Sequence, residues 1–189
     1  MNEHEHDTVM GIYSGGGSMS YQDFIVALRI MDRLREAPFL PTPLHVIREM
    51  LNLARPKPGE VLVDLGSGDG RVLILAAKEY RCRCVGYEVD PRLVKISEEM
   101  IRREGLTDLV GVVRGDLFRA NISCADVITI YLSPDAMRRL EPKLRNETKG
   151  GTRMVSHDYP IPGWQPIRVK RIDTGGIHVH RIYLYIKEG

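Results

Sequence analysis

Three glycines stand at alternate positions in the stretch 61–73, which reads VLVDLGSGDGRVL. They are Gly66, Gly68 and Gly70, and they follow an apolar run. Because glycine lacks a Cβ, a glycine-rich turn between a strand and a helix lets backbone N–H groups approach a bound ligand closely. The turn is therefore a candidate cofactor-binding loop.

The spacing and the charges of this turn narrow the choice of ligand. A dinucleotide fingerprint needs a third glycine where this chain has Arg71, and a P-loop needs a Gly-Lys-Ser/Thr ending that the turn lacks. Asp64 and Asp69 add negative charge, which suits a pyrophosphate badly and a cationic ligand well. S-adenosylmethionine carries an ammonium and a sulfonium group, so the turn favours this cofactor.

Two further acids follow the next two apolar runs. Glu88, in CVGYEVD, lies 22 residues after Gly66, close to the roughly 20-residue offset at which an acid meets ribose hydroxyls after one helix and one strand. Asp116, in GVVRGDLF, ends a third apolar run. Taken alone, each acid is as well explained as a helix cap or a loop residue. Acids at three successive strand ends instead form a coherent cofactor site.

The elements that would position these residues alternate regularly. We expect strands at 61–66, 84–89, 110–115, 126–132 and 152–158, and helices at 69–80, 91–104 and 134–146. This alternation predicts a parallel sheet that binds ligands at the carboxyl ends of its strands. The last two apolar runs are joined only by TGG and predict an antiparallel hairpin. The expected fold class is α/β and Rossmann-like, a mostly parallel seven-stranded sheet with helices on both faces and a C-terminal antiparallel hairpin.

Two segments precede this alternation. Residues 1–19 combine charges, histidines and a glycine run, and we expect a disordered tail. Residues 20–36 have helical spacing and predict an amphipathic accessory helix, which could cover the cofactor site, form an oligomer contact or pack on the core. Thr42 and Pro43 predict the N-cap and first residue of the next helix. The main domain is expected to span 38–189.

Composition sets the broad class. A chain of 189 residues predicts one domain with a substantial core, and its net charge of +2 comes without a concentrated basic tract for nucleic acid. Three cysteines without paired spacing favour a reducing compartment, with Cys82 and Cys84 as packing residues and no metal site. With no membrane-length apolar run and no signal-peptide pattern, the predicted localisation is cytoplasmic.

Six motifs occur in order along residues 38–188: PFLPTP, DLGSGDGR, VGYEVD, GDLF, YLSPDAMRRLEPKL and GTRMVSHDYPIPGW. With them the chain resembles the class I S-adenosylmethionine methyltransferases. Within that superfamily it looks like the archaeal protein-lysine methyltransferases related to the eukaryotic family with sequence similarity 173. The glycine motif is common to the superfamily, whereas PTP and VSHDY followed by GW are much narrower.

The resemblance implies a cofactor site for S-adenosylmethionine. Thr42 would lie near its methionine end and Tyr131 beside the sulfonium. The implied cofactor-binding residues are Thr42, Asp64, Gly66 and Gly68 in the glycine turn region, Glu88 at the ribose, Asp116 and Leu117 at the adenine, and Tyr131. Plainer explanations stay open for three of them: Thr42 as a helix cap, Leu117 as a core residue and Tyr131 as a packing residue.

The resemblance also implies that the acceptor is a lysine on the surface of proteins, with a broad range of protein substrates. The candidate catalytic residues are Tyr131 and His157, which would line the acceptor pocket from two strand ends. Strand alternation puts Ser156 and Asp158 on the opposite side from His157 and Tyr159 unless the strand ends early. His157 is equally explained as a supporting residue, and no dedicated catalytic base is identified.

Rival functions stay open at the level of sequence. An RNA methyltransferase is the first alternative, although the fourth strand ends in TIYLSP and not in the Asn-Pro-Pro-Tyr type of signature. A small-molecule methyltransferase is less favoured because residues 133–151 are too short to add a lid. A third alternative is a non-enzymatic protein that binds the cofactor as a sensor. The expected partners are protein substrates with surface lysines and no membrane; contact with nucleic acid and the oligomeric state are left open.

Overall fold

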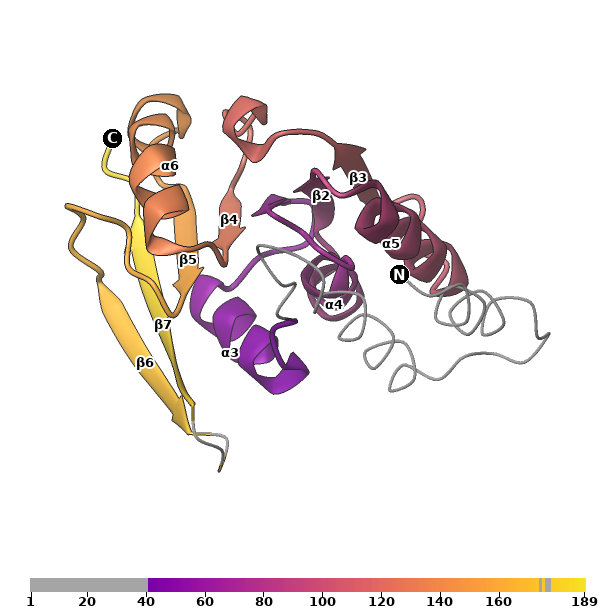
Figure 1. Cartoon of the computed structure of the whole chain (residues 1–189), viewed down its shortest axis with the longest axis horizontal. Coiled ribbons are helices and arrows are strands. Elements are labelled where there is room, and N and C mark those ends of the chain that lie inside the picture. Colours follow the sequence, from indigo (N-terminus) through magenta and orange to yellow (C-terminus); the bar gives the residue numbers. More distant parts are fainter. Residues whose placement is uncertain (1–40, 174, 176–177) are drawn as a thin grey trace, which may run out of the picture. The chain divides into compact units, whose positions relative to one another are not determined.

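A computed structural model describes residues 41–173, 175 and 178–189. The expected tail at 1–19 and accessory helix at 20–36 lie outside these described residues. The described chain forms a seven-stranded sheet with the order β3-β2-β1-β4-β5-β7-β6 (Figure 1). The strands are β1 (Val61–Leu65), β2 (Arg83–Glu88), β3 (Val110–Arg114), β4 (Val127–Ile130), β5 (Arg153–His157), β6 (Arg168–Asp173) and β7 (Val179–Ile186).

The pairing of the strands confirms the predicted mixed sheet. Strands β1 to β5 pair in parallel with their neighbours, whereas β7 runs antiparallel to both β5 and β6. Only β7 therefore runs against the other strands, since β6, which is antiparallel to β7, points the same way as β1 to β5. This arrangement brings the carboxyl ends of β1, β2, β4 and β5 to the same edge of the sheet.

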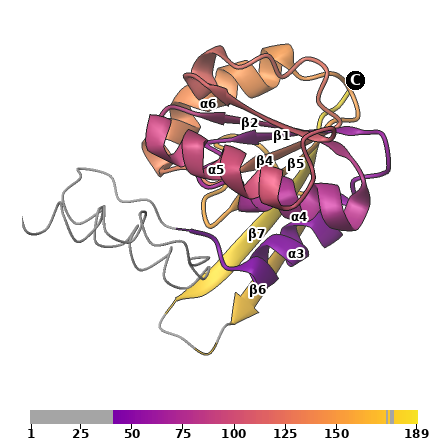
Figure 2. The ribbon, with the colours of Figure 1, turned by 90° about the vertical axis from the view of Figure 1, so that its right-hand side faces the viewer.

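Helices cover both faces of the sheet. They are α3 (Leu44–Ala54), α4 (Arg71–Tyr80), α5 (Pro91–Arg103) and α6 (Pro134–Glu147), with a short 3-10 helix η1 (Leu117–Arg119). Helices α3, α4 and α5 lie on one face and α6 on the other (Figure 2). None of the helices in this part of the chain is long and apolar enough to cross a membrane.

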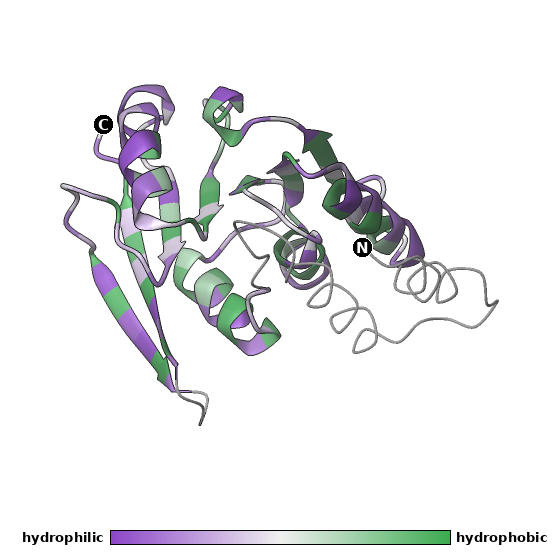
Figure 3. Ribbon diagram, in the orientation of Figure 1, coloured by the Kyte–Doolittle hydropathy of each residue, from purple (hydrophilic) through white to green (hydrophobic). Residues whose placement is uncertain are grey.

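Successive residues of a strand pack into two separate hydrophobic cores, one on each face of the sheet. In β1, Leu62 packs with the α3, α4 and α5 side, while Val63 packs with the α6 side. Val127 and Ile128 in β4 divide in the same way, because successive side chains of a strand point to opposite faces. Hydrophobic and hydrophilic stretches alternate along α3 and α5, as expected of amphipathic helices on a sheet (Figure 3).

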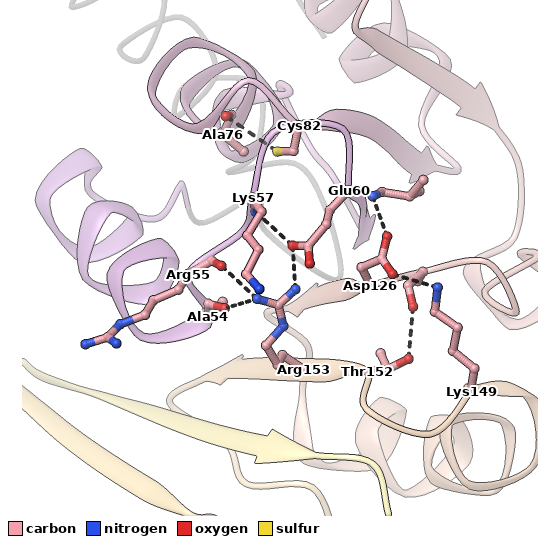
Figure 4. Close-up of polar contacts among 12 residues, drawn as sticks. Ala54, Arg55, Lys57, Glu60, Ala76, Cys82, Asp126, Lys149, Thr152 and Arg153 are labelled. Carbon is pink, nitrogen blue, oxygen red and sulfur yellow. Dashed lines mark hydrogen bonds and ion pairs between the residues drawn. The ribbon is translucent and has the colours of Figure 1, made fainter. Parts of the chain in front are cut away.

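Polar contacts close the end of the sheet where β1, β4 and β5 begin (Figure 4). The Arg153 guanidinium donates to two carbonyl oxygens at the end of α3 and forms a 2.5 Å ion pair with Glu60. Beside it, Lys149 forms a 2.6 Å ion pair with Asp126. The Arg153 contacts thus provide partners for two carbonyl oxygens at the end of α3, where the helix itself supplies none.

The two cysteines before and in β2 pack as expected. Cys82 and Cys84 are free, buried thiols whose sulfur atoms lie 3.6 Å apart. Both belong to the core on the α3, α4 and α5 side of the sheet.

Candidate cofactor and acceptor site

The glycine turn after β1 has a backbone that suits glycine. Gly66, Gly68 and Gly70 have φ values of 84°, 56° and 80°, in the left-handed region. A Cβ at Gly66 would lie 3.3 Å from the Leu132 side chain and 4.0 Å from that of Leu117. The missing Cβ therefore leaves a narrow cradle between the turn and two leucines that come from distant parts of the sequence.

Asp64 is a buried acid directly before this turn. It is 5% exposed and accepts a 2.7 Å hydrogen bond from the Thr129 hydroxyl. Burial raises the pKa of Asp64 to about 7, against the opposing effect of that hydrogen bond, and the carboxylates of Glu88 and Asp69 raise it further. A cationic ligand close by would favour the charged form of this group.

Glu88 links the glycine turn to the start of α5. One carboxylate oxygen accepts the backbone N–H of Gly68 at 2.9 Å, and the other accepts that of Asp90 at 2.9 Å. These two bonds hold the carboxylate still at the end of β2. Each oxygen retains a second lone pair, so the group can still accept hydrogen bonds from ligand hydroxyls.

The charge of Asp69 is compensated inside the turn, which differs from the sequence interpretation. Asp69 is completely buried and pairs with the Arg71 guanidinium through contacts of 2.8 Å and 2.5 Å. Arg71 also donates to the carbonyl oxygen of Thr42 at 3.0 Å. The residue that replaces the third dinucleotide glycine thus neutralises Asp69, and the charge available to a ligand comes from Asp64 and Glu88.

The third predicted acid has a local partner. Asp116 follows β3, is exposed, and accepts the backbone N–H of Phe118 at 2.9 Å as the N-cap of η1. The next residue, Leu117, reaches toward Gly66. The structure therefore brings Leu117 to the glycine turn and places Asp116 at the rim, with the capping role that the sequence left open.

Tyr131 and His157 come together from the ends of β4 and β5. Their ring centroids are 4.1 Å apart, with an angle of 39° between the ring planes. Burial and the nearby carboxylate of Asp158 raise the pKa of Tyr131 to about 12. The Tyr131 hydroxyl therefore keeps its proton at neutral pH.

Thr42 does not cap α3, so that expectation is wrong. The N-cap residue is Pro43, the helix begins at Leu44, and no side chain caps it. The Thr42 hydroxyl instead lies 3.3 Å from Nδ1 of His157. This contact connects the segment before α3 to the end of β5, next to Tyr131.

Strand β5 ends at His157, earlier than predicted. Asp158 has a φ of 60°, which turns the chain so that its Oδ2 lies 3.4 Å from Nε2 of His157. His157 and Asp158 therefore face the same place, although adjacent residues of a continued strand would not. The same oxygen lies 2.9 Å from Nε2 of His178, and Nε2 of His157 lies 2.9 Å from Nδ1 of His180.

Two further histidines, His178 and His180, were not predicted as site residues from the sequence. His178 directly precedes β7 and His180 is the second residue of that strand, and their ring centroids lie 4.6 Å apart. The alternate placement of the two histidines is visible in the segment IHVHRIYLYI. Their position beside His157, however, depends on the antiparallel pairing of β7 with β5. Burial, together with His180 and His178, lowers the pKa of His157 to about 4, while Asp158 opposes this effect.

The parallel sheet with an antiparallel β7, the glycine turn after β1 and the fixed acid at the end of β2 together define a class I S-adenosylmethionine-dependent methyltransferase. More narrowly, the chain belongs to the family of the ANTKMT methyltransferase domain, whose model matches residues 64–168.

Individual relatives share most of the chain. It is 37% identical to a protein-lysine N-methyltransferase of Saccharolobus islandicus, over 82% of this chain and 97% of that protein. It is 36% identical to the adenine nucleotide translocase lysine N-methyltransferase of Mus musculus, over 78% of this chain but only 64% of that protein. A solved structure described as an RNA methyltransferase from Salinibacter ruber, in complex with S-adenosyl-L-homocysteine, is 42% identical with a TM-score of 0.73, covering 79% of this chain and 94% of that one.

Proposed function

We propose that the chain methylates lysine side chains of proteins, with a broad range of protein substrates. The observation that carries the proposal is the similarity to a protein-lysine N-methyltransferase over nearly the whole of that relative. Mouse and human relatives that are also named for lysine methylation share 36% identity with the chain. Lysine is thus the acceptor named for relatives from distant organisms.

The residues at the strand ends fit S-adenosylmethionine, which supplies an activated methyl group when bound. Two observations support the fit: the cradle at Gly66 that a Cβ would fill, and the buried Asp64 whose raised pKa a cationic ligand would relieve. In the proposed site Asp64 faces the methionine ammonium and Glu88 accepts the ribose hydroxyls. The full proposed set is Thr42, Asp64, Gly66, Gly68, Glu88, Asp116, Leu117 and Tyr131.

At the acceptor side we propose different roles for Tyr131 and His157. Tyr131 keeps its hydroxyl proton and orients the incoming amine. Both ring nitrogens of His157 already have neighbours, Thr42 on one side and His180 on the other, so His157 holds the Tyr131 ring in place.

The acceptor lysine must lose its proton before it can react. With an ordinary pKa near 10.4, deprotonation at pH 7 costs roughly 4 kcal/mol. Transfer of the ammonium into a partly buried site lowers this cost, because desolvation disfavours the charged form. We assign no dedicated base to this step.

An RNA methyltransferase is the second candidate, because one similar solved structure carries that description. Two features of the chain weigh against it: the absence of a concentrated basic tract and the TIYLSP ending of β4.

The two candidates can be separated in one experiment. The full chain is incubated with S-adenosylmethionine labelled in its methyl group and with cell extract, and the products are treated with protease or ribonuclease. We expect label that survives ribonuclease, and peptide mass spectrometry that shows methyl increments on lysine. Label found in RNA alone, or on residues other than lysine, would contradict the proposed acceptor.

We propose a cytoplasmic location, supported by the three free cysteines, of which Cys82 and Cys84 lie in contact without a disulfide. Fractionation of source cells with an antibody to the chain tests this proposal. Recovery with the membrane or secreted fraction would contradict it.

A further inference from the structure

Two histidines and an aspartate come together on the α3 side of the sheet where β5 ends and β7 begins. Nε2 of His157, Oδ2 of Asp158 and Nδ1 of His180 all lie within 4.8 Å of one another. His157 is buried, and Asp158 and His180 are half-buried. We propose that these three groups form a binding site for a divalent cation of the Zn²⁺ type.

The separations of the three atoms suit a common ligand. They are 2.9 Å between the two histidine nitrogens, 3.4 Å from His157 to Asp158 and 3.9 Å from His180 to Asp158. Two ligand atoms bound at about 2.0 to 2.1 Å to a tetrahedral Zn²⁺ ion stand about 3.3 Å apart. The three atoms thus already form a triangle of nearly the required size, and small side-chain rotations would complete it.

The chemistry of the donor set selects the cation. Two imidazole nitrogens and one carboxylate oxygen suit Zn²⁺, whereas Mg²⁺ and Ca²⁺ favour sites made of oxygen atoms. Three protein ligands also leave a fourth position open for water or another molecule. The site is therefore expected to distinguish Zn²⁺ from the hard cations.

Neighbouring residues orient the ligands, as outer partners commonly do in metal sites. The Thr42 hydroxyl lies 3.3 Å from Nδ1 of His157. A hydrogen bond from Nδ1–H to this oxygen leaves the ring's lone pair on Nε2, the atom that faces His180 and Asp158. His178 contacts the Asp158 carboxylate at 2.9 Å. The backbone N–H of Arg181 also donates to Asp158, at 3.0 Å, so the carboxylate is held from two sides.

The local backbone fixes this arrangement before any metal arrives. The left-handed conformation of Asp158 turns its carboxylate back toward β5, and its N–H bonds the carbonyl oxygen of Arg181 at 2.7 Å. His180 comes from the same face of β7 as Ile182, the register partner of His157. His157 and His180 therefore sit on paired strands and Asp158 directly follows β5, so the backbone leaves the three ligands little freedom to move apart.

The test measures binding of Zn²⁺ alone to the full chain, by competition with a chromophoric chelator, without cofactor or acceptor. We expect one tight equivalent, with Mg²⁺ unable to compete. Asp158→Asn and His180→Asn should each weaken Zn²⁺ binding at least roughly tenfold. Because neither cofactor nor acceptor takes part, the result does not depend on the proposed lysine methylation.

Other histidines serve as the matched control. His4→Ala combined with His6→Ala removes two histidines far away in the sequence and should leave the tight equivalent unchanged. Substitution with Co²⁺ gives a second readout, since coordination by nitrogen produces visible absorption bands that His180→Asn should abolish. Circular dichroism checks that each variant is folded. Loss of the tight equivalent in the His4/His6 variant, or its persistence in both Asp158→Asn and His180→Asn, would overturn the proposal.

Discussion

The hydroxyl of Thr129 in β4 donates a 2.7 Å hydrogen bond to the Asp64 carboxylate in the neighbouring strand β1, where the two residues are register partners. Both side chains are buried. One hydrogen bond does not compensate the loss of water around a carboxylate, and burial raises the pKa of Asp64 to about 7. The ligand-free chain thus holds an acid whose charge is costly until a cation approaches.

The first prediction concerns binding of S-adenosylmethionine by Asp64. The variant Asp64→Asn keeps an oxygen for Thr129 and removes the charge, so cofactor affinity should fall by roughly 1.5 to 3 kcal/mol. The affinity of the original chain should rise with pH between about 6 and 8, because the charged carboxylate forms in that range. Calorimetry at several pH values checks both effects. Equal affinities, or the same pH dependence in the variant, would rule out contact between Asp64 and the cofactor.

The second prediction concerns stability without ligand. Because the pKa of Asp64 is raised in the folded state, its contribution to stability is present below the ordinary value of 3.8 and is lost as the pH rises through about 7. Asp64→Asn should therefore raise the free energy of unfolding above pH 7, by at most roughly 4 kcal/mol, and much less at pH 5. Denaturant unfolding at both pH values measures the difference.

The matched control for this prediction is Asp126→Asn. The pKa of Asp126 is lowered by its hydrogen bonds with Lys149 and the Val61 backbone, although burial acts in the other direction. That variant should lose stability at neutral pH, the opposite sign to Asp64→Asn. A fall in stability for both variants would contradict the raised pKa of Asp64.

The third prediction concerns Glu88, whose two oxygens are fixed by the backbone N–H groups of Gly68 and Asp90. Glu88→Ala should weaken cofactor binding by roughly 1.5 to 3 kcal/mol, the range for hydrogen bonds to a charged group. Glu104→Ala, which breaks an exposed ion pair with Lys78, is the control and should bind the cofactor normally. Unchanged affinity in Glu88→Ala would exclude the ribose contact.

Features set by neighbouring residues in the sequence could be predicted, whereas contacts between residues far apart in the sequence could not. The order of strands and helices followed from local periodicity, and the acids at the ends of β1 and β2 followed from their spacing to the glycine turn. The pairing of Asp69 with Arg71 was not predicted, because the two side chains fold back on each other within a buried turn. The contact between Thr42 and His157 joins residues 115 positions apart and depends on how β5 ends.

The meeting of His178 and His180 with His157 is the clearest example of an arrangement that depends on contacts between distant parts of the sequence. His178 and His180 stand at alternate positions in the sequence, and this spacing alone indicates no more than a shared face of a strand. Their meeting with His157 requires the antiparallel pairing of β5 with β7 and the left-handed turn at Asp158. Neither feature has a local signature that would identify a metal site.

The fourth prediction concerns the close approach of the glycine turn to α5. A Cβ at Gly70 would lie 2.1 Å from the Ser97 hydroxyl oxygen, and the residue has a φ of 80°. Gly70→Ala should therefore destabilise the chain by more than the roughly 1 to 2 kcal/mol of a left-handed alanine. Gly105→Ala, with a φ of 65° and open space around it, measures that conformational cost alone.

The double variant Gly70→Ala with Ser97→Ala separates strain from collision. Removal of the Ser97 hydroxyl should recover part of the lost stability, so the two substitutions should not be additive. Thermal unfolding of the four proteins gives the interaction free energy. Additive effects would show that the turn moves away from α5 without meeting Ser97.

The fifth prediction separates the acceptor-side roles of Tyr131 and His157 from binding of the cofactor. If Tyr131 orients the amine and His157 holds the Tyr131 ring, then Tyr131→Phe and His157→Ala should lower turnover about tenfold or more, since each lost hydrogen bond costs roughly 0.5 to 1.5 kcal/mol and misalignment adds to it. Cofactor affinity should change much less. Tyr80→Phe, which loses a 2.8 Å hydrogen bond from α4 to Asn52 in α3, is the matched control.

The pH dependence of turnover adds a readout that packing alone would not change. The rate should rise with pH toward the lysine pKa near 10.4, because the neutral amine becomes more abundant while the Tyr131 hydroxyl, with its pKa of about 12, stays protonated. Tyr131→Phe should keep this rise but at a lower rate throughout. Loss of cofactor affinity as large as the loss of turnover would instead place both residues in the cofactor site, and full activity in both variants would leave them as packing residues.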